Sequence, residues 1–335
     1  MTDGERGELE GRAGAVLAEL GYGPAERPMV LCVVDRSGWA HDRKTAALAS
    51  ALADRYRIVT RFQHEVTAAD LESADLVLLY YWLQVDRLGD LVATLRRRRD
   101  RLLLGICSEF ELEGAWREPG LALLAELPRT VFAINLALVR TVEPQIGRPV
   151  LYTPNGVDTD FFRPPAPRHP SGSLRVGWAG SLTNHGPEQR GVHDFIAPAV
   201  AKVPGARLCL AAREERWRGL EEMRAFYHSL DVYVCASKSE GAPNPCLEAA
   251  ASGLPVVTTR VGSMPELIRH GDNGFFVERD VADIAGRLDQ LRRDPELRGR
   301  LGRAARTTVE AWDWRYQAGR FDAMFRGALG RIDGR

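Results

Sequence analysis

The chain has 335 residues, which is long enough for two domains that each bury a core. It carries 45 lysine and arginine residues and 45 aspartate and glutamate residues, so its charge gives no reason to expect a nucleic-acid partner. The five cysteines show no C-x-x-C pair, the first 27 residues lack a signal-peptide pattern, and no apolar run could span a membrane. These features predict reduced cysteines and a cytoplasmic protein.

Apolar runs alternate with helix-like segments in the first half of the sequence. The runs, each typical of a buried strand, are residues 28–35, 57–62, 75–82, 101–107 and 130–135. This alternation predicts an α/β domain with a doubly wound parallel sheet, whose strands bind ligands at their carboxyl ends. The turn Gly38-Trp39-Ala40-His41 follows the first strand, so it is expected to face any cleft between domains. His41 could orient an acceptor hydroxyl or a phosphate there.

Charged residues elsewhere in this half are interpreted as exposed. A basic run, Arg96–Arg99 with Arg101, could bind an anionic membrane surface, or it could be a solvated helix end that complements the helix dipole. The neutral net charge favours the helix end, so peripheral membrane contact is not favoured. Glu109 and Glu111 follow the fourth strand and could meet a cationic acceptor, although exposed acids are the default expectation.

The middle of the chain contains a turn, a linker and a second series of strands. Residues 151–165 include a Pro-Asn-Gly turn, and residues 164–173 have the composition of a linker. The strand 174–180 ends at Gly180, where Gly180 and Ser181 can offer backbone amides to a diphosphate. The strand 206–212 is followed by Arg213, for which exposure is expected, and no further strand is expected before Asp231.

The segment 237–267 combines two carboxylates with strong helix signals. A buried strand, 230–236, leads into it, and Asn244 followed by proline predicts a helix start. Glu240 on the loop and Glu248 on the helix therefore lie at the carboxyl edge of a parallel sheet, with Gly241 allowing close approach of a ligand. The spacing alone leaves open that Glu248 only complements the helix dipole and that Glu240 is solvated.

Farther along, residues 263–266 have the S-x-x-E form of a capping box, in which Glu266 caps a helix. Helices are expected over 281–311. The step Trp312-Asp313-Trp314 precedes a final helix.

Together these segments resemble the retaining glycosyltransferases of family 4, the glycosyl transferases group 1, which have the GT-B fold. The resemblance rests on Glu240 and Glu248 as an E-x7-E pair within the frame EG-x-P, LEA and Gly-Pro-Val-Val, and on the segment PNGVD-x-x-F. It covers residues 149–325 well and the first half in outline. It implies two doubly wound Rossmann-like domains facing across a cleft: 1–155 on the acceptor side and 156–312 on the donor side. A helix within 313–335 would cross back to the first domain.

The resemblance also implies roles for individual residues. Glu240 and the amides of Gly241 and Ala242 would face the donor sugar, and Glu248 would bind the ribose hydroxyls. Arg190 is the nearest counterpart of a Lys-Gly step that neutralises the diphosphate. The full predicted donor-binding set is Gly180, Ser181, Arg190, Glu240, Gly241, Ala242, Asn244, Leu247 and Glu248. The predicted catalytic residues are Glu240, His41 and Arg190.

Two positions depart from the family pattern. Cys107 and Ser108 stand where the family commonly places a histidine that contacts the donor sugar, which adds interest to His41. Trp178 occupies the region of a phosphate-binding arginine, so one positive charge is missing there. Gly38, Trp39, His41 and Ser108 form the predicted acceptor side. Asp158-Thr159-Asp160 has the form of a metal-binding D-x-D, but enzymes of this type work without metal, and no metal or cofactor is expected.

The implied reaction moves a sugar from a nucleotide-diphosphate donor, with UDP favoured, to the hydroxyl of a small-molecule or saccharide acceptor, with retention. The composition fits a high-GC bacterial gene. Two alternatives stay open. One is another GT-B chemistry, either a nucleotide-sugar epimerase or a phosphorylase, which would need a lysine such as Lys44, Lys202 or Lys238 for pyridoxal. The other is a catalytically idle sugar-nucleotide-binding subunit. The sequence leaves the acceptor and the oligomeric state open.

Overall fold

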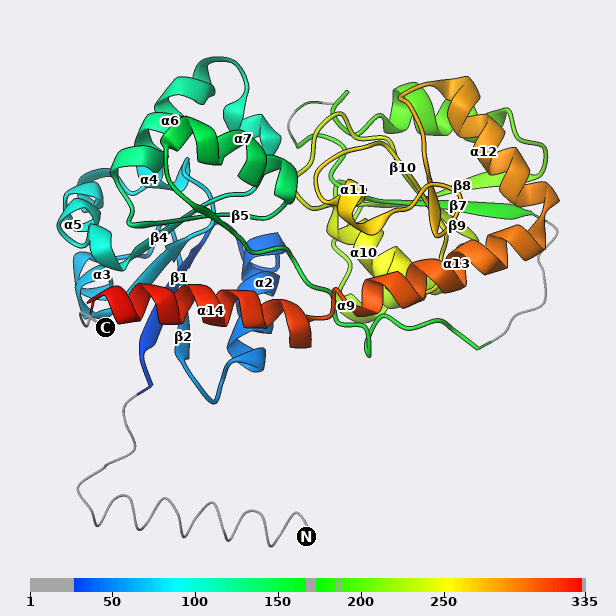
Figure 1. Ribbon diagram of the computed structural model, residues 1–335. Coiled ribbons are helices and arrows are strands. Elements are labelled where there is room, and N and C mark those ends of the chain that lie inside the picture. The colour runs from blue at the N-terminus through cyan, green and yellow to red at the C-terminus, as the bar shows by residue number, and fades with distance from the viewer. Residues whose placement is uncertain (1–26, 167–172, 185, 187, 333–335) are drawn as a thin grey trace, which may run out of the picture.

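The computed structural model describes residues 27–166, 173–184, 186 and 188–332. Two parallel sheets, each covered by helices on both faces, form two lobes that lie side by side (Figure 1). Residues 1–26 of the predicted first domain, 333–335 of the predicted final segment and most of the predicted linker lie outside the described residues. The predicted domain boundaries therefore stay predictions.

The first sheet contains six described strands in the order β2-β1-β3-β4-β5-β6, and all neighbours run parallel. The strands are β1 (Met29–Val34), β2 (Arg57–Phe62), β3 (Leu76–Leu79), β4 (Leu102–Ile106), β5 (Thr130–Ala133) and β6 (Val150–Tyr152). The five predicted strands are present. The sequence did not indicate β6, because it is short and Leu151 is exposed at the edge of the sheet.

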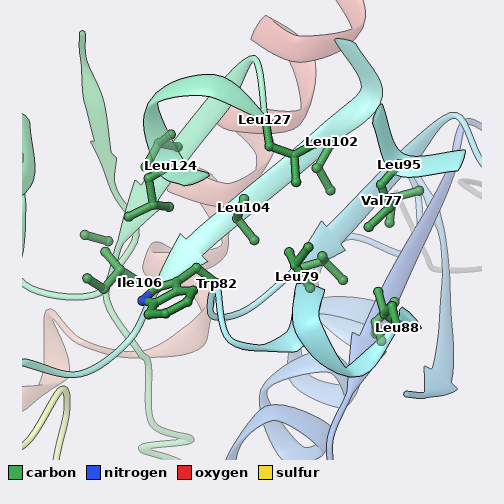
Figure 2. Close-up of a cluster of buried hydrophobic side chains, with 14 of the residues drawn as sticks. Val77, Leu79, Trp82, Leu88, Leu95, Leu102, Leu104, Ile106, Leu124 and Leu127 are labelled. Carbon is green, nitrogen blue, oxygen red and sulfur yellow. The ribbon is translucent and has the colours of Figure 1, made fainter. Parts of the chain in front are cut away.

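Helices cover both faces of this sheet. Those that follow its strands are α2 (Ala40–Ala51), α3 (Ala68–Ser73), α4 (Gln84–Arg87), α5 (Val92–Arg97), α6 (Arg117–Glu126) and α7 (Leu136–Ile146), with short tighter turns η1 (Gly89–Leu91), η2 (Arg99–Arg101), η3 (Glu109–Leu112) and η4 (Gly114–Trp116). Figure 2 shows the core on the face of α3 to α7, where Leu79, Leu104 and Ile106 meet Trp82. The Trp82 indole nitrogen donates to the carbonyl oxygen of Glu111 at 3.2 Å, so this core also anchors the loop after β4.

The second sheet contains five described strands in the order β11-β10-β9-β7-β8. The strands are β7 (Leu174–Gly180), β8 (Ala206–Ala212), β9 (Val232–Cys235), β10 (Val256–Thr258) and β11 (Gly274–Phe276). The helices are the π-helix η5 (Val192–Ile196), α8 (Ala197–Ala201), α9 (Leu220–His228), α10 (Asn244–Ala251), α11 (Met264–Leu267), α12 (Val281–Arg293) and α13 (Pro295–Glu310). As predicted, no strand lies between β8 and β9 in this described segment; α9 occupies it.

The predicted capping box at 263–266 is wrong. Ser263 makes no side-chain cap to α11. Glu266 instead reaches the first domain, where its carboxylate accepts hydrogen bonds from the Leu136 amide at 2.7 Å and from the Tyr152 hydroxyl. The Glu266 carboxylate therefore binds groups of the first domain and does not take part in a capping box at α11.

The basic run at the end of α5 is largely paired within the first domain. Arg97 contacts Glu72 at 3.5 Å, Arg101 contacts Asp75 at 3.4 Å, and Arg98 donates to main-chain carbonyls. This arrangement supports the interpretation as a helix end rather than a membrane patch. None of the described helices combines the length and apolar character needed to cross a bilayer.

Helix α14 (Trp314–Ile332) leaves the second lobe and lies along the face of the first sheet opposite α6 and α7, beside α2 (Figure 1). Phe321 and Phe325 are fully buried against the first domain. The buried carboxylate of Asp322 accepts a hydrogen bond from Tyr56 at 2.9 Å and pairs with Arg55 at 2.6 Å. The helix therefore completes the core of the first domain, although the whole second domain lies between the two in the sequence.

We expect Phe325→Ala to lower the free energy of unfolding by about 3 to 5 kcal/mol, because the ring is fully buried and its loss leaves a cavity. Tyr316→Ala is the control on the same helix; its ring is 64% exposed, and its effect is expected to stay within about 0.5 kcal/mol. Urea unfolding of both variants measures the difference. Equal effects would contradict the packing role of α14.

Candidate active site

A cavity of about 500 Å³ lies between the two domains, at the carboxyl ends of both sheets. The first domain lines it with the turn after β1 and the start of α2. The second domain lines it with the segments that follow β7, β8 and β9. Ligands of open α/β sheets bind at this edge. The predicted site residues that line the cavity are Gly38, Trp39, Gly180, Ser181, Arg190, Glu240, Ala242, Asn244 and Glu248.

Four predicted site residues lie outside the lining: Leu247, Gly241, His41 and Ser108. Leu247 is fully buried in the core under α10. Asn244, although it lines the cavity, accepts a hydrogen bond from the Asn155 side chain at 2.8 Å. These two side chains thus serve the structure around the cavity.

At Gly241, the loop after β9 packs directly against the backbone of the first domain. A Cβ atom at this position would overlap the carbonyl oxygen of Cys107, so only glycine fits. The Gly241 carbonyl accepts hydrogen bonds from the Asn135 side chain at 2.9 Å and from the Ser263 amide at 3.0 Å. The sequence predicted a close approach of this glycine to a ligand, whereas the backbone here approaches the other domain.

Glu240 is held by two partners within the second domain. Ser237, two residues after the end of β9, donates its hydroxyl to the Glu240 carboxylate at 2.8 Å, and the Arg190 guanidinium forms an ion pair with the same oxygen. Burial of Arg190 opposes its charged form, but the Glu240 carboxylate raises the pKa of Arg190. The predicted diphosphate cation and the predicted sugar-binding carboxylate are therefore brought into direct contact.

Glu248 is buried on α10 and has a partner at each carboxylate oxygen. The Arg43 guanidinium, on α2 of the first domain, contacts one oxygen at 2.7 Å. The Tyr227 hydroxyl, on α9, donates to the other at 2.7 Å. This glutamate does more than complement the dipole of its own helix, because it forms an ion pair across the cavity.

The turn after β7 already holds an anion from the protein itself. The Glu214 carboxylate accepts hydrogen bonds from the Ser181 hydroxyl at 2.6 Å, from the Leu182 amide at 3.0 Å and from the Thr183 amide at 3.2 Å. Although burial opposes it, this set lowers the pKa of Glu214 to about 2. The groups of this turn that bind the carboxylate are the Ser181 hydroxyl and the Leu182 and Thr183 amides, so the predicted diphosphate role of the Gly180 and Ser181 amides stays a prediction.

His41 lies on α2 and is not among the residues that line the cavity. Its Nδ1 atom is 3.1 Å from an Asp35 carboxylate oxygen, and its ring stacks on Tyr80 and Tyr81 with centroids 4.8 and 5.3 Å away. Burial works against ionisation of Asp35, but the hydrogen bond and charge of His41 lower the pKa of that carboxyl. The pair resembles a base and its orienting acid, but neither residue lines the cavity.

Glu111 was expected to be an exposed acid, and this expectation is wrong. Its side chain is buried in η3 after β4, where one oxygen accepts from the Cys107 amide at 2.8 Å. The other oxygen is buried without a hydrogen-bond partner among the described residues. Burial raises the pKa of Glu111 to about 7. Ser108, the predicted acceptor-side residue, accepts from the Phe110 amide and starts this same turn.

Arg213 was also expected to be exposed. It is half-buried and lines the cavity, and its amide donates to the Gly180 carbonyl at 3.0 Å. The signal that could have found it is its position: it follows β8 directly, at the same sheet edge as Gly180.

The D-x-D segment is engaged in the structure of the second domain. Asp158 accepts from the Phe161 amide at 2.8 Å, and Asp160 pairs with Arg315 at 3.3 Å. Within the described ranges, no group of three or more potential metal ligands is found. A reaction without metal stays a prediction.

The profile of the family described as glycosyl transferases group 1 matches residues 217–308, which carry both cavity glutamates. This match covers less than half of the chain and shows that this segment is similar to the family. Sulfoquinovosyl transferase SQD2 of Arabidopsis thaliana is 32% identical over 48% of this chain and 36% of that protein. A D-inositol 3-phosphate glycosyltransferase of Streptomyces avermitilis is 28% identical over 60% of this chain and 53% of that protein. The chain thus aligns with about a third to a half of these relatives' lengths.

Solved structures place the chain in the GT-B fold, as predicted. Sucrose-phosphate synthase from Thermosynechococcus elongatus superposes with a TM-score of 0.75 at 15% identity, covering 91% of this chain and all of that one. HepE from Anabaena, solved with UDP and glucose, gives 0.71 at 16% identity, with 90% of this chain and all of that one covered.

We expect the stability difference between Glu111→Gln and wild type to depend on pH. The folded-state pKa of Glu111, about 7, lies above its ordinary value of 4.5, so the wild type loses stability as pH rises from about 4.5 through about 7, where the carboxyl ionises more readily in the unfolded chain. Glutamine cannot ionise but keeps an oxygen for the Cys107 amide. Urea unfolding should show the variant gaining up to about 3 kcal/mol over wild type between about pH 4 and pH 8. The exposed control Glu113→Gln should show no such trend; a flat difference for Glu111→Gln would contradict its buried state.

Proposed function

We propose that this chain transfers a sugar from a nucleotide-diphosphate donor, with UDP favoured, to an acceptor hydroxyl, with retention and without metal. The observation that carries the proposal is that Glu240 and Glu248 line one cavity between the domains and that each is held by an arginine. A cavity of about 500 Å³ suits a ligand of nucleotide-sugar size.

In this proposal the donor lies along the second domain. Glu248 accepts hydrogen bonds from the ribose hydroxyls, for which its two oxygens are oriented by Tyr227 and Arg43. Glu240 accepts from the hydroxyls of the donor sugar. The UDP and glucose bound to HepE support UDP as the nucleotide to test first.

The chemical problem of the reaction is charge. As the bond from the anomeric carbon to the diphosphate breaks, the carbon becomes oxocarbenium-like and the leaving diphosphate gains negative charge. Arg190 and the amides of Gly180 and Ser181, which are not the amides that Glu214 accepts from, stabilise that charge. A diphosphate oxygen takes the acceptor hydroxyl proton as the new carbon–oxygen bond forms on the same face, which gives retention. Glu240 then positions the donor rather than attacking it.

The acceptor enters from the first domain, through the Gly38–Trp39 turn. His41 is held by Asp35. It orients the acceptor indirectly, through the adjoining Gly38–Trp39 turn. The position of the lysines argues against the phosphorylase alternative. None of Lys44, Lys202 and Lys238 is among the residues that line the cavity. Lys44 lies buried over the rings of Tyr80 and Phe321.

We expect UDP, GDP, ADP or dTDP to raise the melting temperature of the wild type, and Glu248→Ala to remove most of that shift, because the ribose loses a charged acceptor. The affinity loss is expected to be about 10- to 100-fold. Glu296→Ala, an exposed glutamate near the start of α13, is the control and should keep the full shift. A shift that Glu248→Ala leaves intact would contradict the ribose contact. No shift of the wild type with any nucleotide would favour the idle-subunit alternative.

We expect Glu240→Ala to lower kcat by about 100-fold with the donor identified in that panel, since a misplaced anomeric carbon reacts poorly. Product formation is followed by NMR, in which the anomeric coupling of the product reports retention. Full turnover by the variant would contradict the role of Glu240. Interconversion of the nucleotide-sugar without any acceptor would instead favour the epimerase alternative.

A further inference from the structure

Most of the positive charge in the cavity is already neutralised. The arginines of the lining that have a carboxylate partner are Arg43 with Glu248, Arg190 with Glu240, Arg216 with Glu222 and Arg218 with Glu215. Arg213 also lines the cavity, but it forms no ion pair with any residue that the structure describes. Its Nη1 atom is buried without a hydrogen-bond partner among those residues. A guanidinium nitrogen withdrawn from water and left unpaired is costly, and an anion in the cavity would satisfy it.

Two tryptophans from different domains hold the Arg213 side chain. Its guanidinium lies 4.2 Å from the ring centre of Trp39, in the first domain, and 5.1 Å from that of Trp217, in the second. The two loops also touch each other, because a Cβ atom on Gly38 would lie 2.8 Å from the Trp217 ring. The attraction between the Arg213 guanidinium and the Trp39 indole therefore acts only while the two domains are together, whereas the contact with Trp217 lies within the second domain.

The position of Arg213 matches one part of a nucleotide-sugar. Its backbone is hydrogen-bonded to Gly180, and Arg213 lines the same cavity as Glu240 and Glu248. Burial lowers the pKa of Arg213, and the positive charges of Arg43 and Arg190 lower it further, whereas the carboxylates of Glu248 and Glu214 raise it. A diphosphate is the group that joins the ribose at Glu248 to the sugar at Glu240.

We propose that Arg213 binds the diphosphate of the donor and that Trp39 is a positioning residue, which presents Arg213 to the diphosphate only when the domains are closed. This inference rests on the proposed function. Glu214 occupies amides of the turn after β7, so the diphosphate needs a charge from another element, and the end of β8 provides it. Opening the domains removes the Trp39 face, frees Arg213 to become hydrated, and thereby weakens the hold on the nucleotide.

The first test measures UDP affinity by isothermal titration calorimetry. Arg213→Gln should weaken UDP binding by about 10- to 100-fold, because a charge-assisted hydrogen bond to phosphate is lost. Arg36→Gln is the matched control. Arg36 also lies over the Trp39 ring, at 4.6 Å, but it does not line the cavity, and its loss should change the affinity by less than about twofold.

The second test asks whether Trp39 acts through Arg213. Trp39→Leu removes the aromatic face and should weaken UDP binding by about three- to tenfold, whereas Trp39→Phe keeps a face and should restore most of it. In an Arg213→Gln background, Trp39→Leu should have no further effect. A purely structural role of Trp39 would give equal losses in both backgrounds and no rescue by phenylalanine.

The outcomes separate this inference from the proposed function. UDP binding that Arg213→Gln leaves unchanged would overturn the inference alone, as would additive effects of the Trp39 and Arg213 substitutions. A wild-type protein that binds none of UDP, GDP, ADP and dTDP would overturn the proposed function, and the inference with it.

Discussion

The carbonyl oxygen of Gly241 accepts one hydrogen bond from the Asn135 side chain of the first domain and another from the Ser263 amide of the second. Because Gly241 has no side chain, its backbone lies directly against the carbonyl of Cys107. This contact sets how closely the two sheets approach at the edge where ligands bind. Any larger residue at this position would separate the domains, and the ion pair and the cation–aromatic contacts that cross the cavity would be lost. The geometry of the site thus depends on backbone more than on side chains.

The two cavity glutamates respond differently to movement of the domains. Glu240 and its partner Arg190 both belong to the second domain, so their pair survives when the domains part. Glu248 is paired with Arg43 of the first domain, so its carboxylate loses that partner on opening. A ribose at Glu248 therefore meets a carboxylate whose surroundings depend on the domain arrangement. Any ligand with different affinity for the two arrangements shifts the balance between them.

Local patterns predicted those features whose causes are local. Strands buried on both faces read as continuous apolar runs, and the Asn-Pro step marked the start of α10. Glu240 and Glu248 could be placed at one sheet edge because both follow β9 closely. Arg213, Glu111 and Glu266 were misjudged for a shared reason. Arg213 contacts Trp39, Glu111 contacts the turn after β4, and Glu266 contacts Tyr152. These contacts arise from packing, which side-chain type and spacing do not encode. Burial of a charged residue depends on what the fold brings to it.

Helix α14 has a consequence for how the chain becomes a folded protein. Its apolar side, with Phe321 and Phe325, covers a face of the first sheet. In the sequence, however, the whole second lobe lies between the first lobe and this helix. During synthesis on the ribosome, the first lobe emerges early but must wait with that face uncovered until the second lobe has been made. Exposed apolar surface on a nascent chain is where chaperones bind and aggregation begins. The order of translation thus gives the second lobe the chance to fold as a unit first, and the first lobe is completed last.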